Sequence, residues 1–68
     1  MWIIAGNNII TDIKEINLFE REHRVNALCI TYNGSNTFTI SRNANKIYNR
    51  LINAVKIDAR VIDITEDI

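Results

Sequence analysis

The segment from Ala27 to Val55 constrains the fold more than any other part of the chain, because strand, turn, strand and helix patterns follow one another with almost no spacer. Its turn is Asn33-Gly34, and both residues accept the positive φ that a type I′ hairpin turn requires, while Ser35 would lengthen the loop. The following residues, Asn36 to Ser41, alternate apolar and polar side chains with the period of two that is typical of a half-buried strand. The segment therefore predicts a β-hairpin followed directly by a helix.

The first strand of this hairpin, predicted over residues 25–32, is apolar on both faces. One face consists of Leu28, Ile30 and Tyr32, and the other consists of Val25, Ala27 and Cys29. Apolar residues on both faces are typical of a central strand that is covered on two sides. Because one helix can cover only one face of a sheet, the sequence predicts a second contact surface.

An amphipathic helix is predicted from Asn43 to Val55, with Ser41 and Asn43 as candidate N-caps. Its apolar residues recur at helical spacing and form one stripe that must lie on the sheet. This stripe consists of Ala44, Ile47, Tyr48, Leu51, Ile52 and Val55. The opposite side carries a basic stripe, which consists of Arg42, Lys46 and Arg50. Basic side chains on one helix face can hold phosphate groups, so the basic stripe is a candidate nucleic-acid surface.

The N-terminal part is predicted to consist of strands. Two short β-branched runs, Trp2 to Ala5 and Ile9 to Thr11, flank a Gly-Asn-Asn turn and predict a hairpin. The segment from Glu15 to Arg21 alternates and favours a strand, although Ile13 and Ile16 also fit the period of a helix.

The C-terminal part is predicted as a short strand from Arg60 to Ile64 and an acidic, frayed tail from Thr65 to Ile68. Whether residues 60–64 join the sheet is left open by the pattern. The expected fold is a single α+β domain, in which an antiparallel sheet of four or five strands carries one helix, residues 43–55, on one face.

Length and charge limit the functional classes. A domain of 68 residues buries a small core, so oligomerisation is a plausible source of additional stability. Eight Lys and Arg residues balance eight Asp and Glu residues, so no net field draws the chain to nucleic acid or to an anionic membrane. No apolar run approaches the about 20 residues of a membrane span, and no signal peptide is recognisable. We expect a cytoplasmic protein that does not contact a membrane.

The sequence contains no recognisable catalytic, cofactor-binding or metal-binding constellation. His23 lies in the charged segment from Glu20 to Arg24, which is predicted as an exposed loop, with no nucleophile beside it. Cys29 lies in the middle of a strand between apolar neighbours, which favours a structural thiol over a reactive one. The spacing of the carboxylates matches no cation-binding loop. We therefore expect no enzymatic activity, no cofactor and no metal ion.

Large apolar side chains outside the expected core indicate contact with another protein. The candidate interface consists of Trp2, Phe19, Val25, Ala27 and Cys29. The alternative is that the N-terminal hairpin folds across this face and covers it. The sequence favours a non-enzymatic protein–protein interaction module that forms a homodimer. An inhibitor of a host defence protein and a nucleic-acid binder that uses the basic stripe are the alternatives.

The opening residues Met1-Trp2-Ile3-Ile4, followed by Asn8-Ile9-Ile10-Thr11 and by Ile16, resemble the N-termini of small proteins of Firmicutes and their phages. That resemblance implies four strands and a helix, and a phage or mobile-element origin. It implies no known active site whose residues could be assigned to positions of this chain.

The order of elements from Ile30 to Val55 is similar to that of small phage anti-CRISPR proteins, which implies inhibition by presenting a surface to a defence protein. Many such inhibitors are acidic mimics of nucleic acid. The neutral charge of this chain and its basic stripe depart from that pattern and argue against mimicry of DNA.

Overall fold

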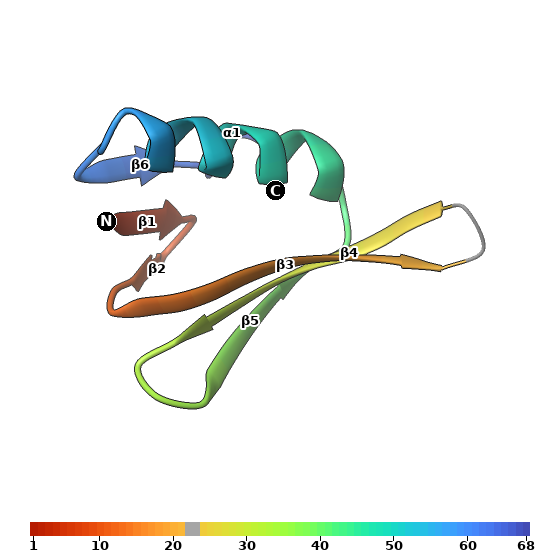
Figure 1. The fold of residues 1–68 in the computed structure, drawn as a ribbon, viewed down its shortest axis with the longest axis horizontal. Helices are drawn as coiled ribbons and strands as arrows, with labels where there is room; N and C mark the ends of the chain where they lie inside the picture. Colours follow the sequence, from red (N-terminus) through yellow and green to blue (C-terminus); the bar gives the residue numbers. More distant parts are fainter. Residues whose placement is uncertain (22–23) are drawn as a thin grey trace.

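The computed structural model describes the backbone of residues 1–21 and 24–68, and the side chains of residues 1–20 and 27–68 (Figure 1). Seven elements follow one another along the chain. They are β1 (Trp2–Ala5), β2 (Asn8–Ile10), β3 (Ile13–Arg21), β4 (Arg24–Tyr32), β5 (Asn36–Ile40), α1 (Ala44–Lys56) and β6 (Val61–Asp63). The fold is α+β, as the sequence predicts.

The strands form two sheets of three strands each, whereas the sequence predicts one sheet of four or five. The small sheet has the order β2-β1-β6, and the large sheet has the order β3-β4-β5. The chain turns between the two sheets at Asp12, whose φ of 52° lies in the left-handed region. This turn separates β2 from β3, so the N-terminal hairpin finds its second neighbour in β6 rather than in the large sheet.

The large sheet is the antiparallel meander that the sequence predicts. Residues 13–21 are a strand and not a helix, and the registers of β3 and β5 place Leu18 and Ile40 on either side of Leu28. Asn33 and Gly34 have φ of 48° and 92°, which confirms the expected positive φ at both positions. Three residues separate the paired Tyr32 and Asn36, so Ser35 does lengthen the loop.

The helix buries a stripe that differs at its end from the predicted one. Its buried residues are Ala44, Ile47, Leu51 and Ala54. Val55 was predicted in this stripe, but its side chain is 57% exposed. The packed line runs through Ile47, Leu51 and Ala54, and Val55 lies on the flank of this line in the last turn of the helix. Asn43 is the N-cap residue by position, although its side chain makes no capping hydrogen bond.

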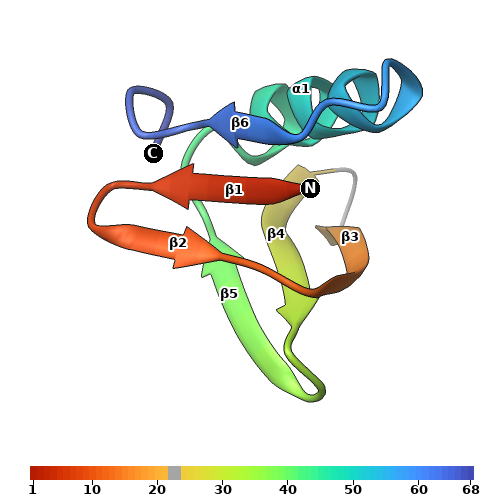
Figure 2. The same cartoon turned by 90° about the vertical axis from the view of Figure 1, so that its left-hand side faces the viewer.

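One hydrophobic core joins the helix and both sheets. Ile3 and Ile10 from the small sheet, Leu28 and Ile30 from β4, and Leu51 from the helix are all at most 1% exposed and belong to the same cluster. The small sheet and α1 therefore lie on the same side of the large sheet, as Figures 1 and 2 show. The N-terminal hairpin does not cover the opposite side of β4, which answers the question that the sequence leaves open.

The C-terminal segment is ordered, so the prediction of a frayed tail is wrong. β6 joins the small sheet, where it pairs in parallel with β1 (Figure 2). Ile64 is fully buried and its N–H donates to the carbonyl of Ile4 at 2.8 Å. Asp67 is only 8% exposed. A buried apolar side chain and a paired carboxylate hold this segment, and the sequence pattern shows neither of these long-range contacts.

Candidate interaction surfaces

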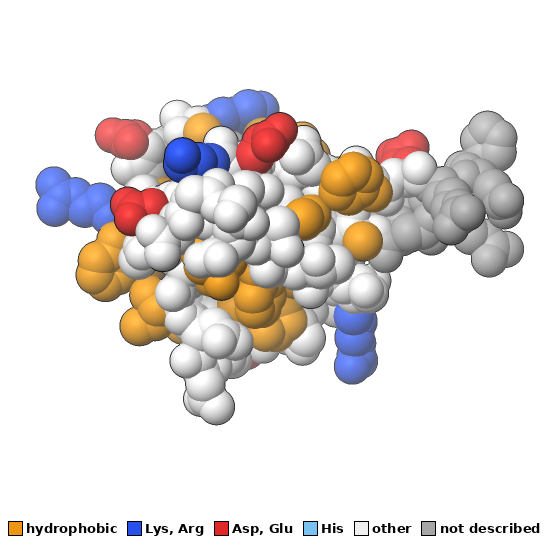
Figure 3. All heavy atoms as spheres, turned by 90° about the horizontal axis from the view of Figure 1, so that it is seen from below, with side chains coloured by type: hydrophobic (Ala, Val, Ile, Leu, Met, Phe, Trp, Pro, Cys, Tyr) orange, Lys and Arg blue, Asp and Glu red, His pale blue; other side chains and the backbone are white. Residues whose placement is uncertain are grey.

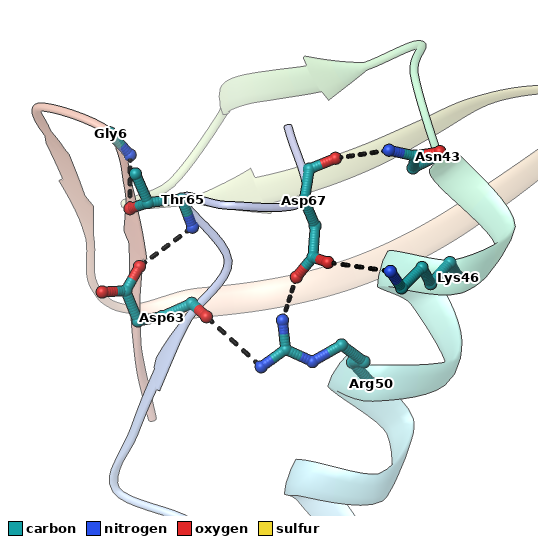
Figure 4. A network of polar contacts seen from close by, with 7 residues as sticks. All are labelled: Gly6, Asn43, Lys46, Arg50, Asp63, Thr65 and Asp67. Carbon is teal, nitrogen blue, oxygen red and sulfur yellow. Dashed lines mark hydrogen bonds and ion pairs between the residues drawn. The ribbon is translucent and has the colours of Figure 1, made fainter.

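Two residues of the basic stripe, Lys46 and Arg50, are in contact with the protein's own C-terminal segment (Figure 4). The Asp67 carboxylate forms an ion pair with Lys46, with 3.4 Å between Nζ and Oδ1, and accepts a hydrogen bond from the Arg50 guanidinium. The Asn43 side-chain amide donates to the backbone carbonyl of Asp67 at 2.8 Å. Three side chains from the N-cap and the first half of α1 thus converge on one acidic residue.

Further hydrogen bonds connect this site to the small sheet. Arg50 also donates to the Asp63 carbonyl at 3.3 Å, and the Thr65 N–H donates to the Asp63 carboxylate at 2.9 Å. The Gly6 N–H donates to the Thr65 hydroxyl at 2.9 Å. Hydrogen bonds from the Thr65 side chain and backbone, together with the Arg50 charge, lower the pKa of Asp63 below its ordinary value. We call this network the C-terminal clasp; it consists of Gly6, Asn43, Lys46, Arg50, Asp63, Thr65 and Asp67.

The clasp changes the chemistry expected of the basic stripe. The hollow beside it is lined by Lys46, Arg50, Asp63, Glu66 and Asp67, so three carboxylates accompany two cations. A phosphate group would have to displace Asp67 and would meet a surplus of negative charge. Arg42 is exposed and takes no part in the clasp contacts. The stripe therefore does not form the continuous cationic surface that its spacing predicts.

Removal of the Asp67 carboxylate is expected to destabilise the fold. We expect Asp67→Ala to lower the free energy of unfolding by about 1 kcal/mol, because a network of charge-assisted hydrogen bonds is lost but the exposed cations are rehydrated. Urea denaturation followed by circular dichroism measures the change. Glu66→Ala is the matched control, because it removes the same charge from an exposed neighbour. Equal effects of both variants would contradict a specific role of the clasp.

The outer face of the large sheet holds three residues of the sequence-predicted interface. Phe19 and Ala27 are register partners, and Cys29 follows on the same face. Phe19 is 54% exposed, while Ala27 and Cys29 are half-buried. Val25 belongs to β4, but its side chain is outside the described part of the structure. We call Phe19, Ala27 and Cys29 the meander face.

The apolar area of the meander face is small. The register partners of Cys29 are Asn17 and Thr39, and those of Thr31 are Glu15 and Thr37. Figure 3 views the molecule from below, the side of Figure 1 on which β5 lies; hydrophobic side chains there form separate groups among polar side chains and backbone. The apolar part of this face is thus bordered by polar residues on the same three strands.

The outer face of the small sheet is more apolar. Trp2, Ile9 and Val61 are 54%, 61% and 52% exposed. Trp2 is the register partner of Val61, and Ile4 is the register partner of Ile9, so these four side chains are neighbours on one face, with Asp63 on the other side of Ile4 at its edge. We call them the hairpin face. Trp2 is therefore on a different sheet from the other members of the predicted interface.

The sequence pattern does not identify Ile9 and Val61 as surface residues. Each lies beside a more buried isoleucine, Ile10 and Ile62, in a strand of only three residues. In such short apolar runs, the pattern does not show which of two adjacent side chains points outward. The sequence does contain a weak indication of exposure: only one face of each short strand can meet the core, so one of two adjacent apolar side chains must point outward.

The remaining sequence candidates give no site. His23 lies outside the described residues. Within residues 1–21 and 24–68, no three His, Cys, Asp or Glu side chains form a group that could hold a metal ion. The helix of this described part, α1, does not have the length and apolar character needed to span a membrane.

Comparison of the chain with protein-family models, with curated proteins and with solved structures finds no match.

Proposed function

We propose that this protein is a small, non-enzymatic protein–protein interaction module of the cytoplasm that self-associates. The observation that carries the proposal is the hairpin face, where Trp2, Ile9 and Val61 are each more than half exposed on one small sheet. The largest contiguous apolar patch on the surface of a soluble protein is often functional, and contact with another protein is its commonest use. A large aromatic side chain among them is typical of interface anchors.

Two properties of the chain support association with a second copy. A folded domain of 68 residues has a free energy of unfolding of about 3–10 kcal/mol, so burial of further apolar surface in a dimer would stabilise it substantially. The formal net charge of zero provides little electrostatic repulsion between copies. Both properties favour self-association over a permanently monomeric state.

The nucleic-acid alternative receives less support. Lys46 and Arg50 pair with Asp67, and the adjacent hollow has more carboxylates than cations. A nucleic-acid binder would show affinity that falls steeply with added salt, and the clasp leaves few cations to produce this dependence.

The oligomeric state tests the proposal. Sedimentation equilibrium of the purified protein from about 1 μM to about 1 mM, a range that brackets weak and moderate affinities, is expected to show a reversible monomer–dimer equilibrium. A protein that is monomeric over the whole range would contradict self-association and would favour a foreign protein as the partner. Circular dichroism at the lowest concentration establishes that the monomer is folded.

A further inference from the structure

We infer that the hairpin face is the dimer interface, and that a second copy of this chain packs on it, sheet against sheet, about a twofold axis. This inference rests on the proposed self-association and names the surface that performs it. The choice lies between the hairpin face and the meander face, because these two sheet faces are not covered by the rest of the described chain.

The exposed area favours the hairpin face. Its three exposed side chains, Trp2, Ile9 and Val61, offer together roughly 300 Å² of apolar surface, which is at the lower end of the range for the largest apolar patch of a monomeric protein, a patch that is often functional. A stable dimer buries about 800 Å² per partner, of which the apolar centre is only a part and the polar rim is the rest. Among the side chains that the structure describes on the outer face of the large sheet, Phe19 is the one large apolar side chain that is exposed, and the register partners of Cys29 and Thr31 are polar.

The surface beside Trp2 extends this apolar area. Met1, Trp2, Arg60 and Val61 line an open hollow, and Met1, Trp2 and Val55 line a second one with residues 12–16. Val55 is 57% exposed on the helix. Trp2 thus lies between two hollows of mixed lining, in which apolar side chains stand beside the charged Asp12, Lys14 and Glu15 in one and beside Arg60 in the other. An aromatic side chain that fills such a hollow of a partner is a typical interface anchor.

The charges at the two ends of β6 make the hairpin face complementary to itself. Arg60 precedes the strand and Asp63 ends it, and both side chains are exposed. A twofold axis in the interface and perpendicular to β6 places Arg60 of each copy opposite Asp63 of the other. Opposite charges then meet at both ends while Trp2 packs against the second copy, and such charge pairs fix orientation more than they add affinity. This self-complementarity is the reason to assign a second copy, rather than a foreign protein, to this face.

Charge insertion on the two faces tests the inference. We expect Ile9→Glu and Val61→Glu each to weaken the dimer at least 10-fold in sedimentation equilibrium, because a carboxylate would be buried among apolar side chains. Phe19→Glu is the matched control on the meander face, with a similar exposed fraction of 54%, and is expected to change the dissociation constant less than 2-fold. Circular dichroism of each variant establishes that it is folded.

The single tryptophan provides an independent measurement, because Trp2 is the only one in the chain. We expect its fluorescence emission to shift to longer wavelength, and its quenching by iodide to increase, as the wild-type dimer is diluted and Trp2 becomes hydrated. The two variants of the hairpin face should show the hydrated emission at every concentration.

One experimental outcome would contradict the location of the interface, another would contradict self-association itself, and the two can be distinguished. A wild-type dimer that is weakened by Phe19→Glu but not by Ile9→Glu or Val61→Glu would place the interface on the meander face, and self-association would stand. A wild-type protein that is always monomeric would contradict the proposed function itself.

The twofold orientation of the two copies in the dimer can be tested separately. Arg60→Glu is expected to weaken the dimer about 3-fold at low salt and less at high salt, whereas Lys56→Glu on the helix is expected to have no effect. Equal effects of both variants would overturn the twofold arrangement.

Discussion

Leu51→Ala is expected to lower the free energy of unfolding by about 2–5 kcal/mol, which is the usual cost of this truncation in a packed core. Leu51 is fully buried on the face of α1 that packs on the large sheet, and the core cluster around it includes Leu28 and Ile47. Because the whole domain has about 3–10 kcal/mol of stability, this loss removes a large fraction of it. Urea denaturation with circular dichroism measures the change.

Val55→Ala is the matched control for this prediction. It removes a similar apolar side chain one helical turn later, but from a position that is 57% exposed. We expect it to change the stability of the monomer by less than about 0.5 kcal/mol. A large effect of Val55→Ala and a small one of Leu51→Ala would show that the helix is rotated relative to the described packing.

Ile64→Ala is expected to lower the free energy of unfolding by about 2–4 kcal/mol, an effect that requires the segment after β6 to be docked on the core. Ile64 is fully buried and lies between Asp63 and Thr65 of the C-terminal clasp. Its truncation leaves a cavity in the core and loosens the residues that place Asp67 on the helix. The stability measurement should therefore show a larger loss than Asp67→Ala alone.

The control for Ile64 is Ile68→Ala, which removes an apolar side chain from a position that is 40% exposed. We expect a change of less than about 1 kcal/mol. Equal small losses for both variants would mean that residues 61–68 do not dock on the small sheet as described.

The clasp and the proposed interface share β6. The strand places Val61 on the hairpin face, while Asp63 at its end belongs to the clasp. A docked C-terminal segment thus keeps Val61 beside Trp2, and we expect any variant that releases the segment to weaken self-association as well. This coupling connects the stability of the fold to the proposed function.

The strongly periodic segments were predictable. β4, the Asn33-Gly34 turn, β5 and the helix follow from side-chain alternation, turn chemistry and the 3.6-residue period, all of which act over short distances in sequence. The number of sheets was not predictable, because it depends on which strand pairs with β1. That partner, β6, lies about 60 residues away, and nothing in either strand specifies it.

The candidate surfaces were predicted only in part. The sequence selected Trp2 and Phe19 as exposed aromatic residues, and both are 54% exposed, but they lie on different sheets. It selected Lys46 and Arg50 as a free basic stripe, because Asp67 is far away in sequence from both. The positions of charges along a helix show its polar face, but not what the rest of the chain places upon it.

The sequence by itself determined the α+β class, the central apolar strand β4 and the amphipathic helix, since these depend on local periodicity. Only the tertiary structure decided that the N-terminal hairpin joins the helix side of the core, that β6 completes a second sheet, and that Asp67 pairs with two of the three cations of the basic stripe. These arrangements arise from burial of Ile3, Ile10 and Ile64 in one shared core, which is a property of the whole chain and of no single segment.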